Sequence, residues 1–269
     1  MKLGRYDAGD GPRIGVIQGD GVRDAGLDLF QPMLNGTTFH RLADVALLAP
    51  VPSPGKVICV GLNYRDHAAE SRMEIPESPV LFAKFANAVV GPGDPIVVPS
   101  ISSEIDYEAE LGVVIGRQAR SVSVDHALDY VLGYTCINDV SARDLQFGDG
   151  QWFRGKSLDT FCPIGPWIVT PEEIPDPQSL GIRCIVNGQT LQDSSTSQMA
   201  FSAAELVSFI SQGITLERGD IISTGTPPGV GFARTPPIWL RPGDEVTVQI
   251  DAIGDLTNPV VSAHAGPAA

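Results

Sequence analysis

The stretch Glu104-Ile-Asp-Tyr-Glu-Ala-Glu-Leu-Gly-Val-Val-Ile-Gly116 decides how this chain is interpreted. From Tyr107 to Ile115 apolar side chains occupy every second position, which predicts a β-strand. Glu108 and Glu110 then point together to the other face. Two ionised carboxylates this close repel each other unless a cation or a shared proton compensates. The pair therefore indicates either a solvated outer face or a cation site.

A third carboxylate follows the next apolar run. Residues 131–137 predict a second strand, and Asp139 comes directly after it. Three carboxylate oxygens suit a hard divalent cation. Glu108, Glu110 and Asp139 are therefore candidate ligands of one metal ion, with the solvated face as the alternative.

The composition sets the class of protein. The chain has 269 residues, of which 43% are apolar and 19% charged, which predicts one large globular domain, alone or with a small appendage. Its formal net charge of −14 argues against nucleic acid or an anionic membrane as a partner, because the general field repels phosphate. No apolar run approaches the roughly 20 residues that span a bilayer, and the N-terminus lacks the apolar segment of a signal peptide. We therefore expect a cytoplasmic protein.

The four cysteines are far apart in the sequence and lie mostly within apolar runs. They form no CxxC motif and no Cys/His cluster. This pattern predicts buried, reduced thiols in preference to zinc ligands or disulfides.

Prolines indicate how the chain is divided. Three prolines fall within residues 49–55, where they stiffen and extend the backbone. The preceding part, residues 1–50, has short apolar runs and Gly-rich turns, which are typical of a small β-rich domain. The main domain then covers residues 56–262.

A candidate general base follows the first strand of the main domain, residues 56–62. His67 and Glu70 are three residues apart on a short predicted helix that Asn63 would cap. A carboxylate beside an imidazole orients the ring and raises its basicity. An isolated pair of this kind is more often an ordinary surface ion pair. The polar residues 71–78 that follow predict a lid.

Several cations and an amide lie near the acidic motifs in sequence. Lys84 stands within a predicted strand, where an ammonium group needs a carboxylate partner or an outward path. Arg143 and Gln146 are one helical turn apart just after Asp139, a spacing suited to holding a substrate carboxylate.

Residues 150–157 match the phosphate-loop pattern G-x-x-x-x-G-K-[ST]. We reject nucleotide binding, because Trp152 and Phe153 fill a loop that needs small residues. Lys156 remains as a cation close to the acidic site. The Gly/Pro-rich residues 224–231 form a loop whose amides and Thr226 hydroxyl are suited to binding an oxyanion.

Taken together, these motifs closely resemble the fumarylacetoacetate hydrolase family, over about residues 56–262. The motifs that carry the resemblance are GLNYRDHAAE at 61–70, YEAELG at 107–112, NDVSARDLQ at 138–146, GKS at 155–157 and TGTPPGVG at 224–231.

The resemblance implies a mixed β fold with some α-helix, in which a β-roll catalytic domain follows a small N-terminal β-rich domain. It also implies a homodimer and Mg²⁺ or Mn²⁺, with Ca²⁺ as a further candidate. The implied site has metal ligands Glu108, Glu110 and Asp139, catalytic residues His67, Glu70 and Lys156, and substrate-binding residues Lys84, Arg143, Gln146 and Thr226.

One departure narrows the resemblance to a branch of the family. Animal-type fumarylacetoacetases have a further metal-binding aspartate just before the catalytic histidine, whereas residues 57–62 here contain no acid. The sequence therefore resembles the smaller branch of acylpyruvate hydrolases, oxaloacetate decarboxylases and hydroxymuconate isomerases.

The implied substrate is a small anionic 2-oxo acid, bound to the ion through its 1-carboxylate and 2-oxo group. The ion would stabilise the enolate that remains when the neighbouring bond breaks. We rank hydrolysis of an acylpyruvate or β-diketo acid first. Decarboxylation or isomerisation of oxaloacetate or 2-hydroxymuconate-type diacids follows closely, and a silent ligand-binding protein is a distant third.

Overall fold

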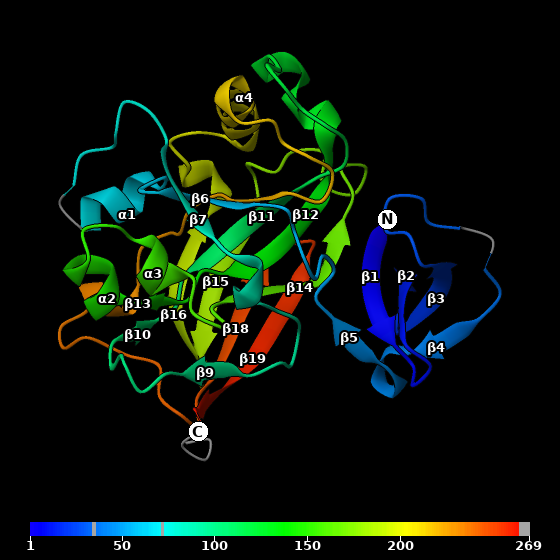
Figure 1. The fold of residues 1–269 in the computed structure, drawn as a ribbon, viewed down its shortest axis with the longest axis horizontal. Helices are drawn as coiled ribbons and strands as arrows, with labels where there is room; N and C mark the ends of the chain where they lie inside the picture. The colour runs from blue at the N-terminus through cyan, green and yellow to red at the C-terminus, as the bar shows by residue number, and fades with distance from the viewer. Residues whose placement is uncertain (34–35, 71–72, 264–269) are drawn as a thin grey trace, which may run out of the picture.

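The computed structural model describes residues 1–33, 36–70 and 73–263 (Figure 1). A twelve-stranded sheet runs through the molecule in the order β4-β3-β2-β1-β14-β12-β11-β17-β6-β7, with β5 paired to β1 and β8 paired to β14. A five-stranded sheet has the order β16-β15-β18-β19-β9, and β10 pairs with β13. This mostly β architecture with few helices confirms the predicted fold class.

The N-terminal strands form one end of the large sheet, and β1 joins them to the rest through the pairs Lys2↔Val169 and Leu3↔Ile168. The strands of this part are β1 (Lys2–Asp7), β2 (Pro12–Gln18), β3 (Gly21–Gly26), β4 (Phe39–Arg41) and β5 (Ala46–Leu48). The proline-rich residues 49–55 connect them to the remainder of the chain.

The other strands belong to the larger part of the molecule. Those of the large sheet are β6 (Val57–Gly61), β7 (Val80–Lys84), β8 (Val89–Val90), β11 (Ala109–Ile115), β12 (Val131–Asn138), β14 (Cys162–Val169) and β17 (Ile221–Ser223). The five-stranded sheet consists of β9 (Ile96–Val98), β15 (Gly181–Val186), β16 (Gln189–Ser195), β18 (Glu245–Ile250) and β19 (Gly254–Ser262). The short pair is β10 (Ile105–Asp106) with β13 (Ser141–Ala142).

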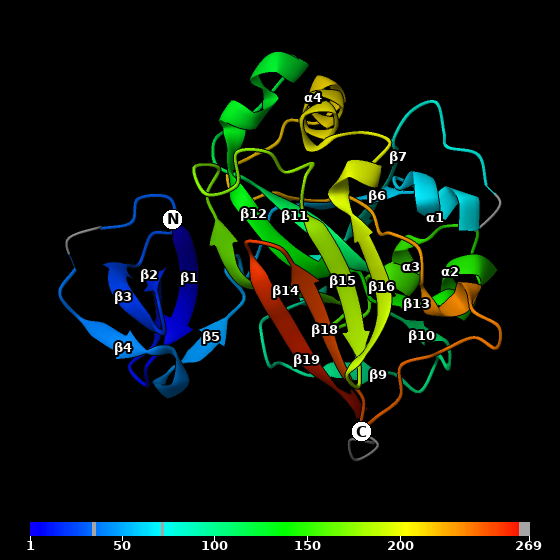
Figure 2. The same cartoon turned by 180° about the vertical axis from the view of Figure 1, so that it is seen from behind.

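Three short helices gather beside β6 and β7, as the views from both sides show (Figures 1 and 2). They are α1 (Arg65–Glu70), α2 (Arg143–Gly148) and α3 (Phe153–Lys156). The longer helix α4 (Ala203–Gly213) lies apart from them, next to the 3₁₀ helix η3 (Val124–Tyr130). The other 3₁₀ helices are η1 (Leu42–Asp44), η2 (Ala86–Ala88), η4 (Thr196–Gln198) and η5 (Gly231–Ala233).

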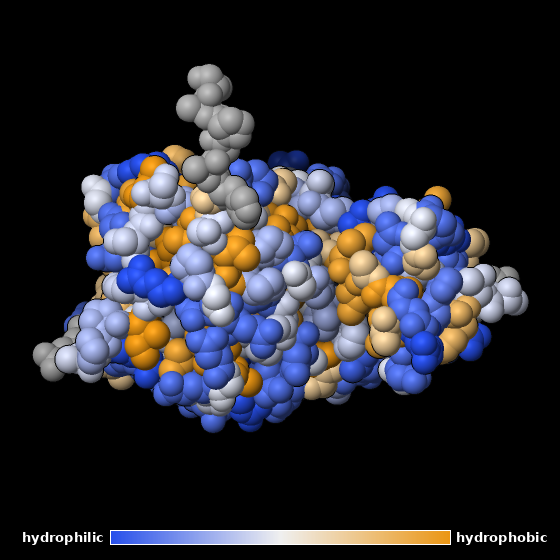
Figure 3. All heavy atoms as spheres, turned by 90° about the horizontal axis from the view of Figure 1, so that it is seen from below, coloured by the Kyte–Doolittle hydropathy of each residue, from blue (hydrophilic) through white to orange (hydrophobic). Residues whose placement is uncertain are grey.

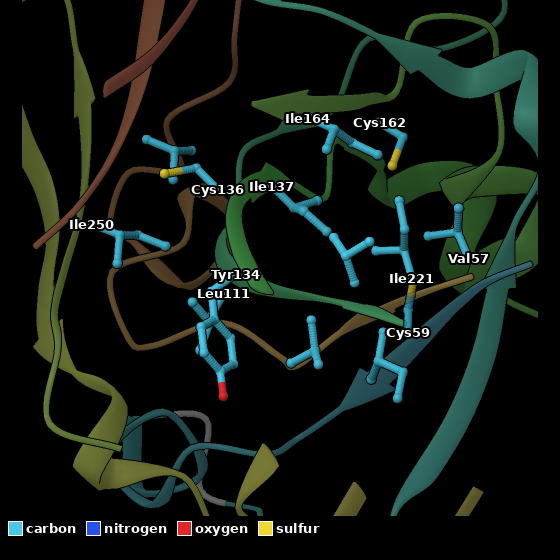
Figure 4. Packing of buried hydrophobic residues seen from close by; sticks show 14 of the residues in the cluster. Val57, Cys59, Leu111, Tyr134, Cys136, Ile137, Cys162, Ile164, Ile221 and Ile250 are labelled. Atoms are coloured by element: carbon cyan, nitrogen blue, oxygen red, sulfur yellow. The ribbon is translucent and has the colours of Figure 1, made fainter. Parts of the chain in front are cut away.

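The core lies between the two sheets of the larger part. Side chains such as Leu111, Ile137 and Ile164 from the large sheet pack in one cluster with Ile250 of β18 (Figure 4). Every residue of β11 is buried, which excludes the solvated outer face. All four cysteines are free and buried, as predicted.

Local sequence features account for several element ends. Ser202 and Glu205 form a capping box at the start of α4, and Asn187-Gly188 turns the hairpin between β15 and β16. Residues 124–130 form a 3₁₀ helix, and the Ser123 side chain before it makes no capping bond. The predicted cap of α1 by Asn63 is wrong, because the side-chain oxygen of Asn63 accepts from the distant Phe201 amide at 2.8 Å. Its NH2 group donates to the carbonyls of Phe201 and Thr224.

The surface seen from below mixes hydrophilic residues with scattered apolar ones on both parts of the molecule (Figure 3). Among the described residues, no helix is long and apolar enough to cross a membrane.

Candidate active site

The three predicted metal ligands lie together. Antiparallel pairing of β11 with β12 sets Ala109 opposite Asn138, so Glu108 and Asp139 flank the same position at the ends of two neighbouring strands. One carboxylate oxygen each from Glu108, Glu110 and Asp139 lies within 4.8 Å of the others. All three side chains are buried, with exposed fractions of 6%, 1% and 0%.

Glu108 is held by two buried cations. Arg143 Nη2 donates to its Oε1 at 2.6 Å, and Lys156 Nζ donates to its Oε2 at 2.8 Å. Lys156 also donates to Asp139 Oδ2 at 2.8 Å, so one ammonium bridges two of the three carboxylates. Burial alone would raise the pKa of Glu108, but the attraction of Lys156 and Arg143 outweighs it and lowers this pKa to about 2.

Glu110 has neutral partners instead. Its Oε2 accepts hydrogen bonds from the Ser223 hydroxyl at 2.6 Å and the Gly225 amide at 2.9 Å. Burial, followed by repulsion from Asp139 and Glu108, raises the pKa of Glu110 well above its usual range. A further positive charge beside Glu110 would relieve this repulsion.

Asp139 has one buried oxygen without a hydrogen bond. Its Oδ1 lies 2.6 Å from Lys84 Nζ, yet the geometry is not that of a hydrogen bond, and this buried oxygen has no hydrogen-bond donor among the described residues. The two ions attract each other, but Oδ1 accepts no hydrogen bond and retains free lone pairs. Three clustered carboxylates, one with an unsatisfied oxygen, fit a hard divalent cation such as Mg²⁺ or Mn²⁺.

His67 and Glu70 form the predicted pair on α1. His67 Nδ1 lies 3.3 Å from Glu70 Oε2, and the His67 residue is only 6% exposed, unlike an ordinary surface pair. His67 lines the same cavity as Glu108 and Glu110, which has a volume of ≈ 120 Å³. The proposed base and two of the proposed metal ligands therefore line the same cavity.

The loop of residues 224–231 contributes differently from the prediction. Its amides bind carboxylates of the protein itself: the N–H groups of Gly225, Gly229 and Gly231 donate to Glu110, Glu70 and Asp106. The Thr226 hydroxyl donates to the Ala109 carbonyl at 3.0 Å and accepts from Gln192 at 2.8 Å, although Thr226 lines the cavity. The loop therefore fastens the acidic groups in place.

Lys84 lies behind the cluster and does not line the cavity. Its ammonium donates to the backbone carbonyls of Val140 at 3.0 Å and Phe161 at 2.7 Å, and to that of Lys156. These bonds use its three protons. Lys84 therefore positions the chain segments that carry Asp139 and Lys156, and its contact with substrate stays a prediction.

Arg143 and Gln146 line the cavity, one turn apart on α2 as predicted. Arg143 is held by Asp106, Gln146 and Glu108 at 2.9, 2.9 and 2.6 Å. Sequence reasoning assigned no role to Asp106, which is fully buried. One indication of this role was present in the sequence, since Asp106 lies two residues before Glu108 in the same acidic stretch.

The predicted lid, residues 71–78, is described only in part, because residues 71 and 72 lie outside the described chain. Met73 lines the cavity and is 51% exposed. This part of the lid borders the site.

Comparison with known proteins agrees with the motifs. The family model described as fumarylacetoacetate (FAA) hydrolase C-terminal matches residues 56–261, and one described as Rv2993c-like, N-terminal matches residues 1–50. The chain is 44% identical to a Bos taurus protein named oxaloacetate tautomerase FAHD2A, mitochondrial, covering 97% of this chain and 92% of that protein. It is 42% identical to its Xenopus laevis counterpart, covering 97% and 90%.

Solved structures give the same result. A 2-hydroxyhepta-2,4-diene-1,7-dioate isomerase from Mycobacterium marinum is 44% identical, with a TM-score of 0.86 over 98% of this chain and 99% of that one. A 5-carboxymethyl-2-hydroxymuconate delta-isomerase from Mycobacterium smegmatis is also 44% identical, with a TM-score of 0.87 over 98% and 100%. This chain therefore belongs to the fumarylacetoacetate hydrolase family of enzymes.

Proposed function

We propose that the protein is a divalent-metal-dependent tautomerase or isomerase of enolisable 2-oxo acids. One observation carries the proposal: the His67–Glu70 pair faces two of the three clustered carboxylates across a single small cavity. The names of the relatives support it, since those described above are called tautomerases or isomerases. They favour the alternative of our sequence analysis over its first-ranked hydrolysis.

The metal would be bound by Glu108, Glu110 and Asp139, where it would polarise the 2-oxo group and stabilise negative charge on its oxygen. The chain's own residues do the rest. Arg143 and Lys156 keep Glu108 ionised and fixed in place. Glu70 engages Nδ1 of His67, which leaves the other ring nitrogen for the substrate.

Tautomerisation needs only that a proton move. The enol loses its O–H proton, the electron pair re-forms the carbonyl, and C3 gains a proton, so no water is consumed. A single imidazole that takes and returns protons is sufficient for this exchange. Hydrolysis of an acylpyruvate would in addition require a second carbonyl and an activated water beside His67.

The proposal is tested by following enol absorbance of oxaloacetate above the buffer rate, with Mg²⁺ and with excess chelator. Acylpyruvate cleavage and decarboxylation are measured in parallel. We expect metal-dependent tautomerisation that falls by about 10²–10⁴-fold in His67→Ala, the usual range for a general base. His126→Ala is the matched control, because His126 forms an exposed pair with Asp129 at the same spacing. Faster acylpyruvate cleavage than tautomerisation would overturn the proposal in favour of a hydrolase.

A further inference from the structure

Four aromatic rings in two pairs form part of the cavity wall. Phe82 and Trp152 form one edge-to-face pair, with ring centroids 5.5 Å apart and an interplanar angle of 70°. Phe147 and Phe232 form a second, at 5.7 Å and 68°. All four rings line the cavity, although they come from β7, the residue before α3, α2 and η5.

Each aromatic pair is joined to Glu108 through a cation. The Arg143 guanidinium lies 4.5 Å from the Phe232 ring centroid, and the Lys156 ammonium lies 5.1 Å from that of Phe82. The same two cations donate to the two oxygens of Glu108. Each of these two cations therefore pairs with a protein carboxylate on one side and lies over an aromatic ring on the other. Among the described residues, no other Lys or Arg lines the cavity.

The two cations that line the cavity are already engaged by the protein. Arg143 donates to Asp106, Gln146 and Glu108, and Lys156 donates to Glu108 and Asp139. A second carboxylate at the far end of a ligand would therefore be a charge without a partner beside aromatic rings, which is unfavourable.

We propose that the site prefers a 2-oxo monocarboxylate with an apolar, and best an aryl, substituent over a 2-oxo dicarboxylate. The oxo-acid head lies at the carboxylate cluster, and the substituent packs between the Phe82–Trp152 and Phe147–Phe232 pairs. This inference names the substrate class of the site and rests on the proposed function. Oxaloacetate is turned over but is not the best substrate.

Two ligands that cannot enolise test the preference directly. Oxanilate and N-oxalylglycine share an oxalyl head and differ in the far end, which is a phenyl ring in one and a carboxylate in the other. Titration calorimetry of the full chain with Mg²⁺ measures each affinity. We expect oxanilate to bind roughly tenfold more tightly, as a ring packed against other rings would give. Equal or tighter binding of N-oxalylglycine, or no binding of oxanilate, overturns the inference.

Substitutions of the aromatic residues test whether the cavity wall causes the preference for oxanilate. Phe147 is 58% exposed, so Phe147→Ala should leave the fold intact, and it should reduce the oxanilate preference several-fold. Phe147→Arg supplies a cation and should turn the preference toward N-oxalylglycine. Phe153→Ala is the control, because this ring is 48% exposed and packs on Phe85 outside the cavity. Equal effects of Phe147→Ala and Phe153→Ala on the ratio would contradict the inference.

The same measurements separate this inference from the proposed function. If oxanilate is preferred but neither phenylpyruvate enol nor oxaloacetate enol is tautomerised, the proposed function fails and the ligand preference stands. If both enols are tautomerised and oxaloacetate has the higher kcat/KM, the proposed function stands and the preference fails.

Discussion

Asp106 and Arg143 form a fully buried ion pair, with Arg143 Nε donating to Asp106 Oδ2 at 2.9 Å. The same carboxylate accepts the amides of Gly231 at 2.7 Å and Phe232 at 3.0 Å. Asp106 therefore connects the loop that carries one cavity wall to the guanidinium that holds Glu108. The position of Glu108, a proposed metal ligand, therefore depends on Asp106, which acts on it through Arg143.

Asp106→Ala should lower the free energy of unfolding by about 3–5 kcal/mol, because it removes one of the two carboxylates that pair with the buried Arg143 guanidinium and leaves the Gly231 and Phe232 amides without this acceptor. Chemical denaturation of the metal-free protein measures the change. Asp44→Ala is the matched control, since Asp44 pairs with Arg41 at 2.7 Å on the exposed surface, where such pairs contribute little. Similar losses in both variants would show that the buried network does not stabilise the fold.

Glu108, which directly precedes β11, and Glu110, which lies within it, should respond differently to amide substitution. From sequence alone, either Glu108→Gln or Glu110→Gln would abolish Mg²⁺-dependent activity and leave the fold intact. In the structure Glu108 compensates Arg143 and Lys156, whereas Glu110 accepts bonds only from a hydroxyl and an amide of the described chain. We therefore expect both variants to lose Mg²⁺ binding, but only Glu108→Gln to lose stability.

Calorimetric titration with Mg²⁺ and thermal unfolding in excess chelator measure the two effects separately. Glu77→Gln, at an exposed position, is the control for removal of one charge. Wild-type Mg²⁺ affinity in Glu110→Gln would exclude Glu110 as a ligand. A thermal midpoint of Glu108→Gln no lower than that of Glu110→Gln would contradict the role of Glu108 in holding the cations.

The strand and its acids were predictable because each leaves a local signature. Alternation marks β11, and paired carboxylates on an apolar strand need compensation. The capping box of α4 is likewise local, because both of its side chains lie within four consecutive residues. Family resemblance added His67, which the residues alone did not distinguish from a surface histidine.

What the sequence did not reveal depends on contacts between distant segments. Asp106 has a role only because β10 pairs with β13 and brings Arg143 close. Lys84 pairs with the carboxylate of Asp139, as a lysine within a strand requires, but its hydrogen bonds to the carbonyls of Val140 and Phe161 leave no mark in a side-chain pattern. Ser123 fits a helix cap by type, but the short 3₁₀ helix after it does not use the hydroxyl.

An ion pair in the N-terminal part predicts a pH effect on stability. Hydrogen bonding to Arg13 is the main cause that lowers the pKa of Asp24 from 3.8 to about 2. Between these values the unfolded chain binds more protons, so the contribution of Asp24 is present above about pH 4 and is lost as the pH falls toward 2. The difference in thermal midpoint between wild type and Asp24→Asn should therefore shrink from pH 5 to pH 3. A constant difference for Asp24→Asn between pH 5 and pH 3 would refute the assignment.

Glu70 has two functions that substitution can separate. Its Oε1 and Oε2 each lie 3.1 Å from the Gly229 amide, and Oε2 also lies 3.3 Å from His67 Nδ1. Gly229 has φ of +99°, and a Cβ there would lie 2.1 Å from the Leu191 carbonyl oxygen, so the loop must keep glycine at this position. Glu70 thus attaches α1 to the loop and also orients the proposed base.

Glu70→Gln keeps an oxygen for the Gly229 amide but removes the charge beside His67, whereas Glu70→Ala removes both. We expect both variants to lose tautomerase turnover, by less than the about 10²–10⁴-fold assigned to His67 itself. Only Glu70→Ala should speed hydrogen exchange of the Gly229 amide, because only that variant leaves the amide without its acceptor. Unchanged exchange in Glu70→Ala would show that the contact does not hold α1 in place. Full activity in Glu70→Gln would show that the carboxylate charge does not assist His67, and that Glu70 acts on the reaction only by fixing the position of the helix.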